Sequence, residues 1–261
     1  MGLINGLFKK PIPETKPHIL MSMVLFPGKD CFSFLWFAED LKQQYGAELG
    51  SEGNDDVAAA FKIKDEQVYL MNMNFPVPSD DIEETAKYSY NWLNAAKDLE
   101  DHQGHIIISL TDHTPNPIKC FRIQTEMICS ILRTTDAIGV YDGGQSLLIP
   151  KNDYLTEAQT MSEDHLPLNL WLYFGLRTTK GKTNGYTYGM RAFGKPEMEI
   201  LDSDRTLEEI YQMLWNIAHY VLLNNVSFVA GQTFGYTPNQ KLDISYSKSR
   251  YAGGYSFKFA Y

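Results

Sequence analysis

A chain of 261 residues with a formal net charge of −9 can bury a sizeable core, but its acidity disfavours binding to duplex nucleic acid or to an anionic membrane surface. Its composition is that of an ordinary globular protein, with 44% hydrophobic and 21% charged residues. The 3 cysteines are too few for a disulfide framework and favour a reducing compartment, so we expect a cytoplasmic protein. The longest apolar tract, 210–223, is shorter than the ~20 residues that a membrane span needs.

The first 150 residues predict a leader followed by an N-terminal lobe. Residues 1–17 form a proline-bearing leader or linker whose lysines follow its short apolar stretch, which is the wrong order for a secretory signal. Within 18–150, strand and helix patterns follow one another in the order β-α-β-β-α-β, at 18–26, 32–45, 58–63, 67–75, 80–99 and 104–112. This order is that of a ferredoxin-like lobe. A further helix is expected to begin at Pro117, and a strand pair is expected to turn at 142–144.

The rest of the chain predicts a second lobe with an antiparallel sheet and one long helix. Residues 151–167 are polar and are expected to be a loop that connects the two lobes. The C-terminal lobe, 168–261, is expected to contain three strands within 168–204, a helix from 206 to about 223, and strands near 226–236, 241–247 and 254–260. We therefore predict an α+β protein of two lobes, and leave open whether the lobes share one sheet.

The three strands within 168–204 carry a pattern that predicts their register. Every second residue of 168–177 is apolar, and the short loops 180–184 and 194–196 are expected to be hairpin turns. The expected buried row is Phe174, Met190 and Ile200. The expected exposed rows are Tyr173 with Arg191 and Glu199, Trp171 with Phe193 and Glu197, and Arg177 with Thr187.

The exposed rows define a candidate binding face. Its two arginines, two carboxylates and two aromatic side chains suit a polar ligand or a loop of a partner protein. The residues of this face are Trp171, Tyr173, Arg177, Arg191, Glu197 and Glu199. The same pattern also fits an ordinary sheet in which Arg191 and Glu199 form a cross-strand ion pair.

Catalytic motifs are weak in this sequence. Asp112 and His113 follow a strand that is expected to be buried, where α/β proteins tend to place their sites, so they are the candidates for a hydrolase-like enzyme. The sequence has no nucleophile elbow, no P-loop and no dinucleotide-binding glycine motif. His102 and His105 are separated by Gly104, which breaks the helix and disfavours a shared metal ion. We therefore predict no catalytic residue, no metal ligand and no cofactor.

A longer motif resembles a known family. The motif is a tryptophan-bearing strand, a G-x-R segment, an aromatic-G-x-P-E-x-E-I segment and a helix that ends in a bulky apolar run. The matching residues are Trp171, Gly175–Arg177, Phe193–Ile200 and Val221–Leu223. This part of the chain is similar to the C-terminal domain of DUF4261, a bacterial family of unknown function. The resemblance implies the fold of that domain and carries no activity, catalytic residue or cofactor.

The absence of a standard catalytic motif, the acidic charge and the aromatic-rich strands favour a binding function. We expect a non-enzymatic cytoplasmic module that binds another protein or a small polar ligand on the candidate binding face or between the lobes. One alternative is a hydrolase-like enzyme with its site around Asp112 and His113. The other alternative is a homodimeric scaffold whose edge strands pair with a second copy.

Overall fold

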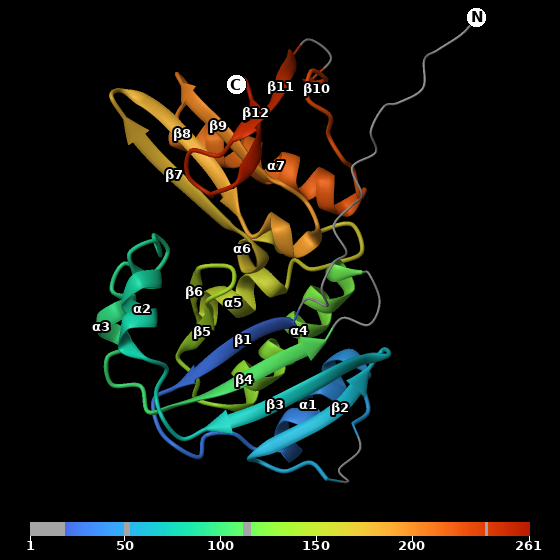
Figure 1. The fold of residues 1–261 in the computed structure, drawn as a ribbon. Helices are drawn as coiled ribbons and strands as arrows, with labels where there is room; N and C mark the ends of the chain where they lie inside the picture. The colour runs from blue at the N-terminus through green and yellow to red at the C-terminus, as the bar shows by residue number, and fades with distance from the viewer. Residues whose placement is uncertain (1–18, 50–52, 112–115, 238–239) are drawn as a thin grey trace, which may run out of the picture.

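The computed structural model describes residues 19–49, 53–111, 116–237 and 240–261, and it confirms the α+β class (Figure 1). Within these residues the strands form two separate six-stranded sheets, so the lobes do not share one sheet. The first has the order β2-β3-β4-β1-β5-β6, and the second has the order β10-β11-β12-β9-β8-β7. The predicted leader, 1–17, lies outside the described residues.

The first sheet is built from the N-terminal half of the chain. Its strands are β1 (Ile19–Phe26), β2 (Ala58–Ile63), β3 (Glu66–Met73), β4 (Gly104–Thr111), β5 (Gly139–Asp142) and β6 (Leu147–Pro150). Its helices are α1 (Phe34–Tyr45), α2 (Ser79–Ala86), α3 (Ala95–Asp98) and α4 (Pro117–Thr134). The predicted start of α4 is confirmed: Pro117 is its first residue, and the Asn116 side chain accepts a hydrogen bond from the Lys119 backbone N–H at 3.1 Å.

The element order β-α-β-β-α-β is present, but the ferredoxin-like arrangement is wrong. A split βαβ unit would place a single strand between β1 and β2, whereas two strands, β3 and β4, lie between them. The reason is that β4 pairs directly with β3 in antiparallel register, so the chain leaves β3 and enters β4 at the same end of the sheet. The intervening segment forms a helical arm of two short helices, α2 and α3, in place of the single helix expected at 80–99.

The second sheet is built from the C-terminal half. Its strands are β7 (Tyr173–Thr179), β8 (Lys182–Tyr188), β9 (Glu197–Ser203), β10 (Thr233–Thr237), β11 (Gln240–Lys248) and β12 (Tyr255–Phe259). Helix α7 (Leu207–Leu223) covers one face, and its predicted start is confirmed by a capping box between Thr206 and Glu209. The sheet is not wholly antiparallel as expected, because β12 pairs with β9 in parallel.

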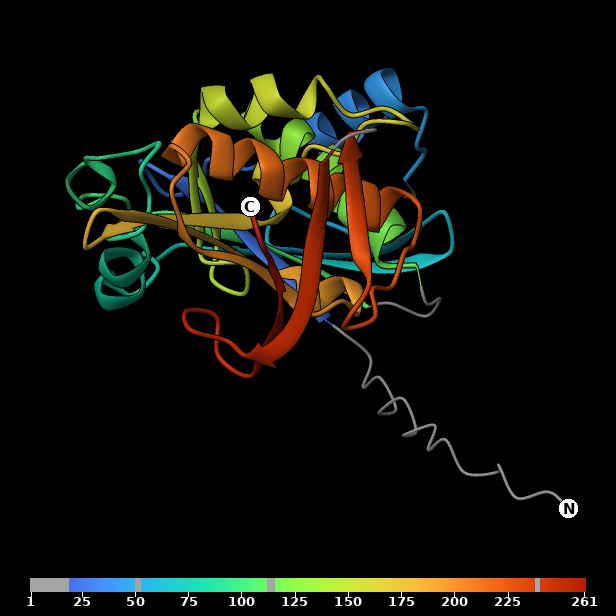
Figure 2. The ribbon, with the colours of Figure 1, turned by 90° about the horizontal axis from the view of Figure 1, so that it is seen from above.

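The segment between the sheets is more helical than its polar composition indicated. Residues 151–167 were expected to be a loop, but α5 (Lys151–Ala158) lies within them and buries Tyr154. A second short helix, α6 (Leu168–Trp171), precedes β7. Figure 1 shows α5 and α6 near the junction of the two sheets and α4 behind the first sheet, and Figure 2 shows α1, α4, α5 and α7 gathered on one side of the sheets. One continuous core runs through both halves, from Val24 in β1 to Phe259 in β12.

The predicted register of β7, β8 and β9 is wrong. The alternation of faces along β7 and β9 is correct, but Glu197 and Glu199, which were expected to be exposed, are buried. A two-residue turn, Lys180-Gly181, joins β7 to β8 in place of a five-residue loop, and both residues have positive φ, at 52° and 77°. Tyr173 therefore pairs with Tyr188 rather than Arg191. The 3₁₀ helix η1 (Met190–Phe193) interrupts the second connection, so Glu199 pairs with Tyr186.

We predict that Gly181→Ala destabilises the protein by about 1 kcal/mol, because alanine is strained at a positive φ that glycine adopts freely. The backbone φ of Gly181 is 77°, and a Cβ there would meet no other atom, so the cost is conformational. Equilibrium unfolding in urea measures the loss in the free energy of unfolding. The matched control is Gly235→Ala, an exposed strand position with open space and no positive φ, which should not lower stability. Equal effects of the two substitutions would contradict the assigned turn.

Candidate functional site

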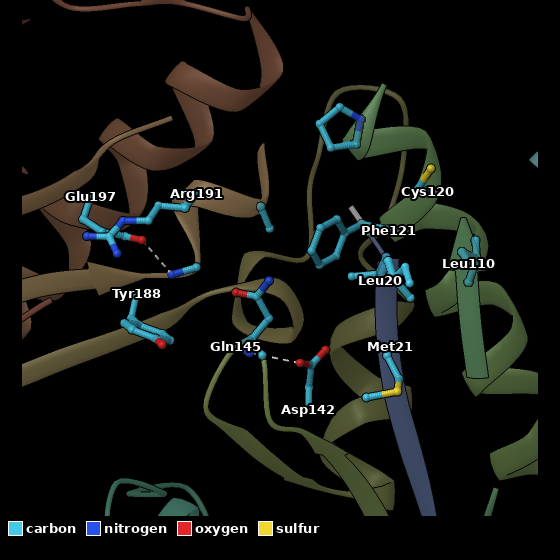
Figure 3. A pocket seen from close by; sticks show the side chains of 15 residues that line it. Leu20, Met21, Leu110, Cys120, Phe121, Asp142, Gln145, Tyr188, Arg191 and Glu197 are labelled. Carbon is cyan, nitrogen blue, oxygen red and sulfur yellow. Dashed lines mark hydrogen bonds between the residues drawn. The ribbon is translucent and has the colours of Figure 1, made fainter. Parts of the chain in front are cut away.

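A cavity of about 320 Å³ lies where the two sheets meet (Figure 3). The first sheet contributes β1, β4, the first turns of α4 and the turn between β5 and β6. The second contributes the end of β8, η1 and the start of β9. The apolar residues in its wall are Ile19, Leu20, Met21, Leu110, Pro117, Cys120, Phe121 and Ala192. The polar and charged residues are Asp142, Gln145, Tyr188, Arg191 and Glu197.

An aromatic cluster beside the cavity holds α4 against the second sheet. Phe121 of α4 stacks on Phe193 of η1 with ring centroids 4.4 Å apart, and Trp171 packs against both rings. The Trp171 indole N–H donates a hydrogen bond to the Thr125 hydroxyl at 2.9 Å. Trp171 was expected on the exposed face and is buried instead, because it lies in α6 and strand β7 begins only at Tyr173.

Asp142 supplies a buried carboxylate at the end of β5. It is only 7% exposed, and its two oxygens accept hydrogen bonds from the Ser22 hydroxyl at 2.8 Å and the Gln145 backbone N–H at 3.0 Å. Burial raises the pKa of Asp142 to about 6, against the opposing effect of these hydrogen bonds. Among the described residues, no Lys, Arg or His forms a salt bridge with it.

Gln145 supplies an amide that has an unused acceptor. The residue is 4% exposed, and its Oε1 has no hydrogen-bond partner among the described residues. A Cβ on Gly189 would lie 2.0 Å from this oxygen, so only glycine at 189, with its φ of 116°, allows the amide to approach. Figure 3 shows the Gln145 side chain with Arg191 and Glu197 on one side and Phe121 on the other.

Glu197 anchors the wall that the second sheet contributes. Its carboxylate accepts hydrogen bonds from the Thr187 hydroxyl at 2.8 Å and the Gly189 backbone N–H at 3.0 Å, and burial raises its pKa. These bonds hold the turn that carries Gly189. Arg191 extends from the same turn, and its guanidinium donates to the carbonyls of Ala252 and Gly253.

Glu199 lies on the same face of β9 as Glu197, but it is outside the cavity wall. It is fully buried beneath the loop between β11 and β12, where Lys258 Nζ pairs with it at 2.8 Å. The hydroxyls of Ser249 and Ser256 donate to it at 2.8 and 2.9 Å. Burial alone would raise the pKa of Glu199, but Lys258 and these donors together hold it below its usual value. The predicted Arg191–Glu199 ion pair is therefore wrong.

The other two predicted residues belong to a chain of aromatic contacts, which we call the tyrosine row. Its members are Tyr88 and Tyr90 on the helical arm, Tyr173 and Tyr186 on β7 and β8, and Tyr251 beyond β11. Tyr186 stacks on Tyr251 at 5.2 Å, and the Arg177 guanidinium lies 5.4 Å from the centre of the Tyr251 ring. Of the predicted face, Tyr173 and Arg177 thus lie in the tyrosine row, whereas Arg191 and Glu197 line the cavity.

The predicted enzyme residues, Asp112 and His113, lie outside the described residues. Within the described part of the chain, no group of three His, Cys, Asp or Glu side chains could hold a metal ion. His102 is a structural residue: its Nδ1 lies 2.6 Å from the Leu99 carbonyl, and its Nε2 accepts a hydrogen bond from the Val77 N–H at 2.9 Å. No described helix combines the length and the apolar composition that crossing a membrane requires.

Sequence reasoning missed Asp142 and Gln145 because the segment was interpreted only as a hairpin turn. One signal was available for Asp142: residues two apart on a strand share a face, and Val140 is apolar and buried in the core. A carboxylate on the same face as Val140 points inward. No local signal identified Gln145, because its environment depends on Gly189 in the other half of the chain.

We predict that the free energy of unfolding of the wild type falls relative to that of Asp142→Asn as the pH rises from about 4 to about 6. Burial raises the pKa of Asp142 from 3.8 to about 6, so between these values the folded protein keeps a proton that the unfolded chain has released. The relative loss should be about 3 kcal/mol, since one pKa unit corresponds to about 1.4 kcal/mol.

Chemical denaturation of both proteins across this pH range measures the difference. The matched control, Asp153→Asn, changes an exposed carboxylate on α5 and should follow the wild type at every pH. A constant difference between wild type and Asp142→Asn would show that Asp142 keeps its ordinary pKa.

Comparison with known proteins identifies one part of the chain. Residues 186–260 match the family described as Domain of unknown function (DUF4261). Neither the curated proteins nor the solved structures contain a match to the chain. The matched segment includes the cavity wall contributed by the second sheet, from Tyr188 to Glu197, but none of the wall contributed by the first. The resemblance to DUF4261 found in the sequence is therefore confirmed over residues 186–260.

Proposed function

We propose that this protein binds a small molecule in the cavity between its two sheets. The observation that carries the proposal is the Gln145 Oε1, a buried acceptor with no partner among the described residues, at the wall of a cavity of about 320 Å³. An unsatisfied buried polar group costs about 1–3 kcal/mol, and rotation of the amide from Gly189 toward a ligand donor would remove that cost. A mainly apolar wall with a few convergent polar groups is also typical of small-molecule sites.

A binding role is supported over a catalytic one by the state of the two carboxylates. Glu197 accepts hydrogen bonds from Thr187 and Gly189, and Asp142 accepts them from Ser22 and Gln145, so both are engaged by the protein itself. We therefore favour a non-enzymatic module. Its proposed setting is the bacterial cytoplasm, which the resemblance to DUF4261 and the free thiols of Cys31, Cys120 and Cys129 support.

A second candidate function is protein binding at the tyrosine row. Tyr88 and Tyr90 are 42% and 46% exposed, and they extend the aromatic contacts of the second sheet onto the helical arm. Tyrosine and arginine are enriched in protein interfaces, so the row with Arg177 at its end suits a partner surface.

A homodimer through an edge strand is the third candidate. The first sheet offers β2 and β6 as its edges, and the second offers β7 and β10.

We predict that Ala192→Leu weakens binding of the neutral dye 1-aminoanthracene at least tenfold, because the added side chain fills the cavity that Ala192 lines. Fluorescence titration of the full chain measures the Kd. The matched control is Ala60→Leu, which adds the same volume at an exposed position of β2 and should leave the Kd unchanged. Equal affinity in all three proteins, or no dye binding to the wild type, would contradict a ligand site in this cavity.

For protein binding at the tyrosine row, we predict that a partner protein captured by the tagged wild type is no longer captured by Tyr90→Ala. The reason is that this substitution removes an exposed ring from the row. A native pull-down from the source cell, analysed by mass spectrometry, identifies the partner protein. Tyr69→Ala is the matched control, since Tyr69 is a similarly exposed tyrosine on β3, away from the row. A partner protein that Tyr90→Ala still captures would argue against binding at the row.

A further inference from the structure

The turn between β5 and β6 carries a buried carboxylate that lacks a counterion and a buried amide oxygen that lacks a donor. The Asp142 carboxylate has no cationic partner among the described residues, and the Gln145 Oε1 has no donor. The hydrogen bond of 3.0 Å from the Gln145 N–H to Asp142 fixes the two residues together. A buried carboxylate is stabilised by a nearby positive charge, and a buried amide oxygen is stabilised by a hydrogen bond from an N–H or O–H donor. An ammonium group supplies both, since it carries three donors and a full charge.

The charge of the rest of the cavity wall also favours a cationic ligand. Glu197 is a second buried carboxylate in it. Arg191 is the one cationic side chain among the described residues that line the cavity, and its guanidinium is held by the carbonyls of Ala252 and Gly253. The wall therefore carries two acidic side chains against one basic side chain that is already engaged. Such a wall attracts a cation and repels an anion.

The side of the cavity that includes Asp142 and faces away from Glu197 suits an apolar body. Leu20, Met21 and Phe121 line it, and Figure 3 shows them on the side away from Glu197. A metal ion does not fit this wall, because the carboxylates in the described residues do not gather into a group that could coordinate one. Carbon and sulfur surfaces favour a hydrocarbon chain or ring beside the charged group.

We infer that the ligand of this cavity is an organic ammonium ion with an apolar body, whose nitrogen bonds the Asp142–Gln145 turn. The inference rests on the proposed function and adds the chemical class of the ligand. The ammonium donates to the Asp142 carboxylate, and the Gln145 amide rotates its buried Oε1 away from Gly189 to accept a second hydrogen bond. The apolar body packs on Phe121 and its neighbours. The site therefore selects its ligand by charge, while the apolar wall adds affinity without selecting charge.

Isothermal titration calorimetry of the full chain at pH 7.5 tests this inference with three probes that share a phenyl ring: 2-phenylethylamine, 2-phenylethanol and phenylacetate. We expect the Kd of the amine to be at least tenfold lower than that of the alcohol, and phenylacetate to bind most weakly. Asp142→Asn should remove the preference for the amine and leave the Kd of the alcohol unchanged. Asp153→Asn, the exposed acid-to-amide control, should behave as the wild type.

The outcomes separate this inference from the proposed function. If the alcohol or phenylacetate binds as tightly as the amine, the cavity is a ligand site but its ligand is not a cation. If the amine does not bind at all, the inference fails. If Ala192→Leu then also leaves binding of 1-aminoanthracene unchanged, the proposed function fails with it. The comparison of amine and alcohol on the wild type decides the question even if Asp142→Asn does not fold.

Discussion

The packing of Phe121, Trp171 and Phe193 is the interaction on which the rest of the structure depends. The two sheets share no hydrogen-bonded strand, so side-chain packing must hold one against the other. Phe121 stacks on Phe193, and the Trp171–Thr125 hydrogen bond fixes the third ring to the same helix, α4. Buried aromatic pairs contribute about 0.5–1.5 kcal/mol each beyond their burial. Because Phe121 also lines the cavity, the contacts that join the sheets set the shape of the site as well.

Three of the buried carboxylates, Glu199, Glu197 and Asp142, differ in how the fold uses them. Glu199 has an ammonium partner, Lys258, and its pKa is lowered, so it behaves as a structural ion. Glu197 has donors but no bound cation, and it holds the turn of Gly189. Asp142 also lacks a cation, and it lies beside an acceptor that has no donor. Burying a charge without a counterion is costly. The molecule tolerates this cost where a bound cation would remove it, and that is the physical argument for a ligand at Asp142.

The elements of the fold were more predictable from sequence than their pairing. Apolar periodicity located α7, and alternation assigned Phe174 and Tyr173 to opposite faces of β7. Alternation defines faces and not partners, so one turn of two residues at Lys180-Gly181 shifted the whole predicted register. The residues expected on one face were separated by this turn, by η1 in the next connection and by the position of Trp171 in α6. The cavity could not be foreseen, because it depends on the fit between Gln145 and Gly189 from different sheets, which no local pattern encodes.

The cavity between the sheets is proposed to bind an organic ammonium ion at the Asp142–Gln145 turn. A crystal structure of the full chain in complex with 2-phenylethylamine tests it most directly. We expect one molecule in the cavity, with its nitrogen within hydrogen-bond distance of Asp142 and its ring against Phe121. Density for the ligand elsewhere, or in the cavity with the nitrogen directed away from Asp142, would contradict it.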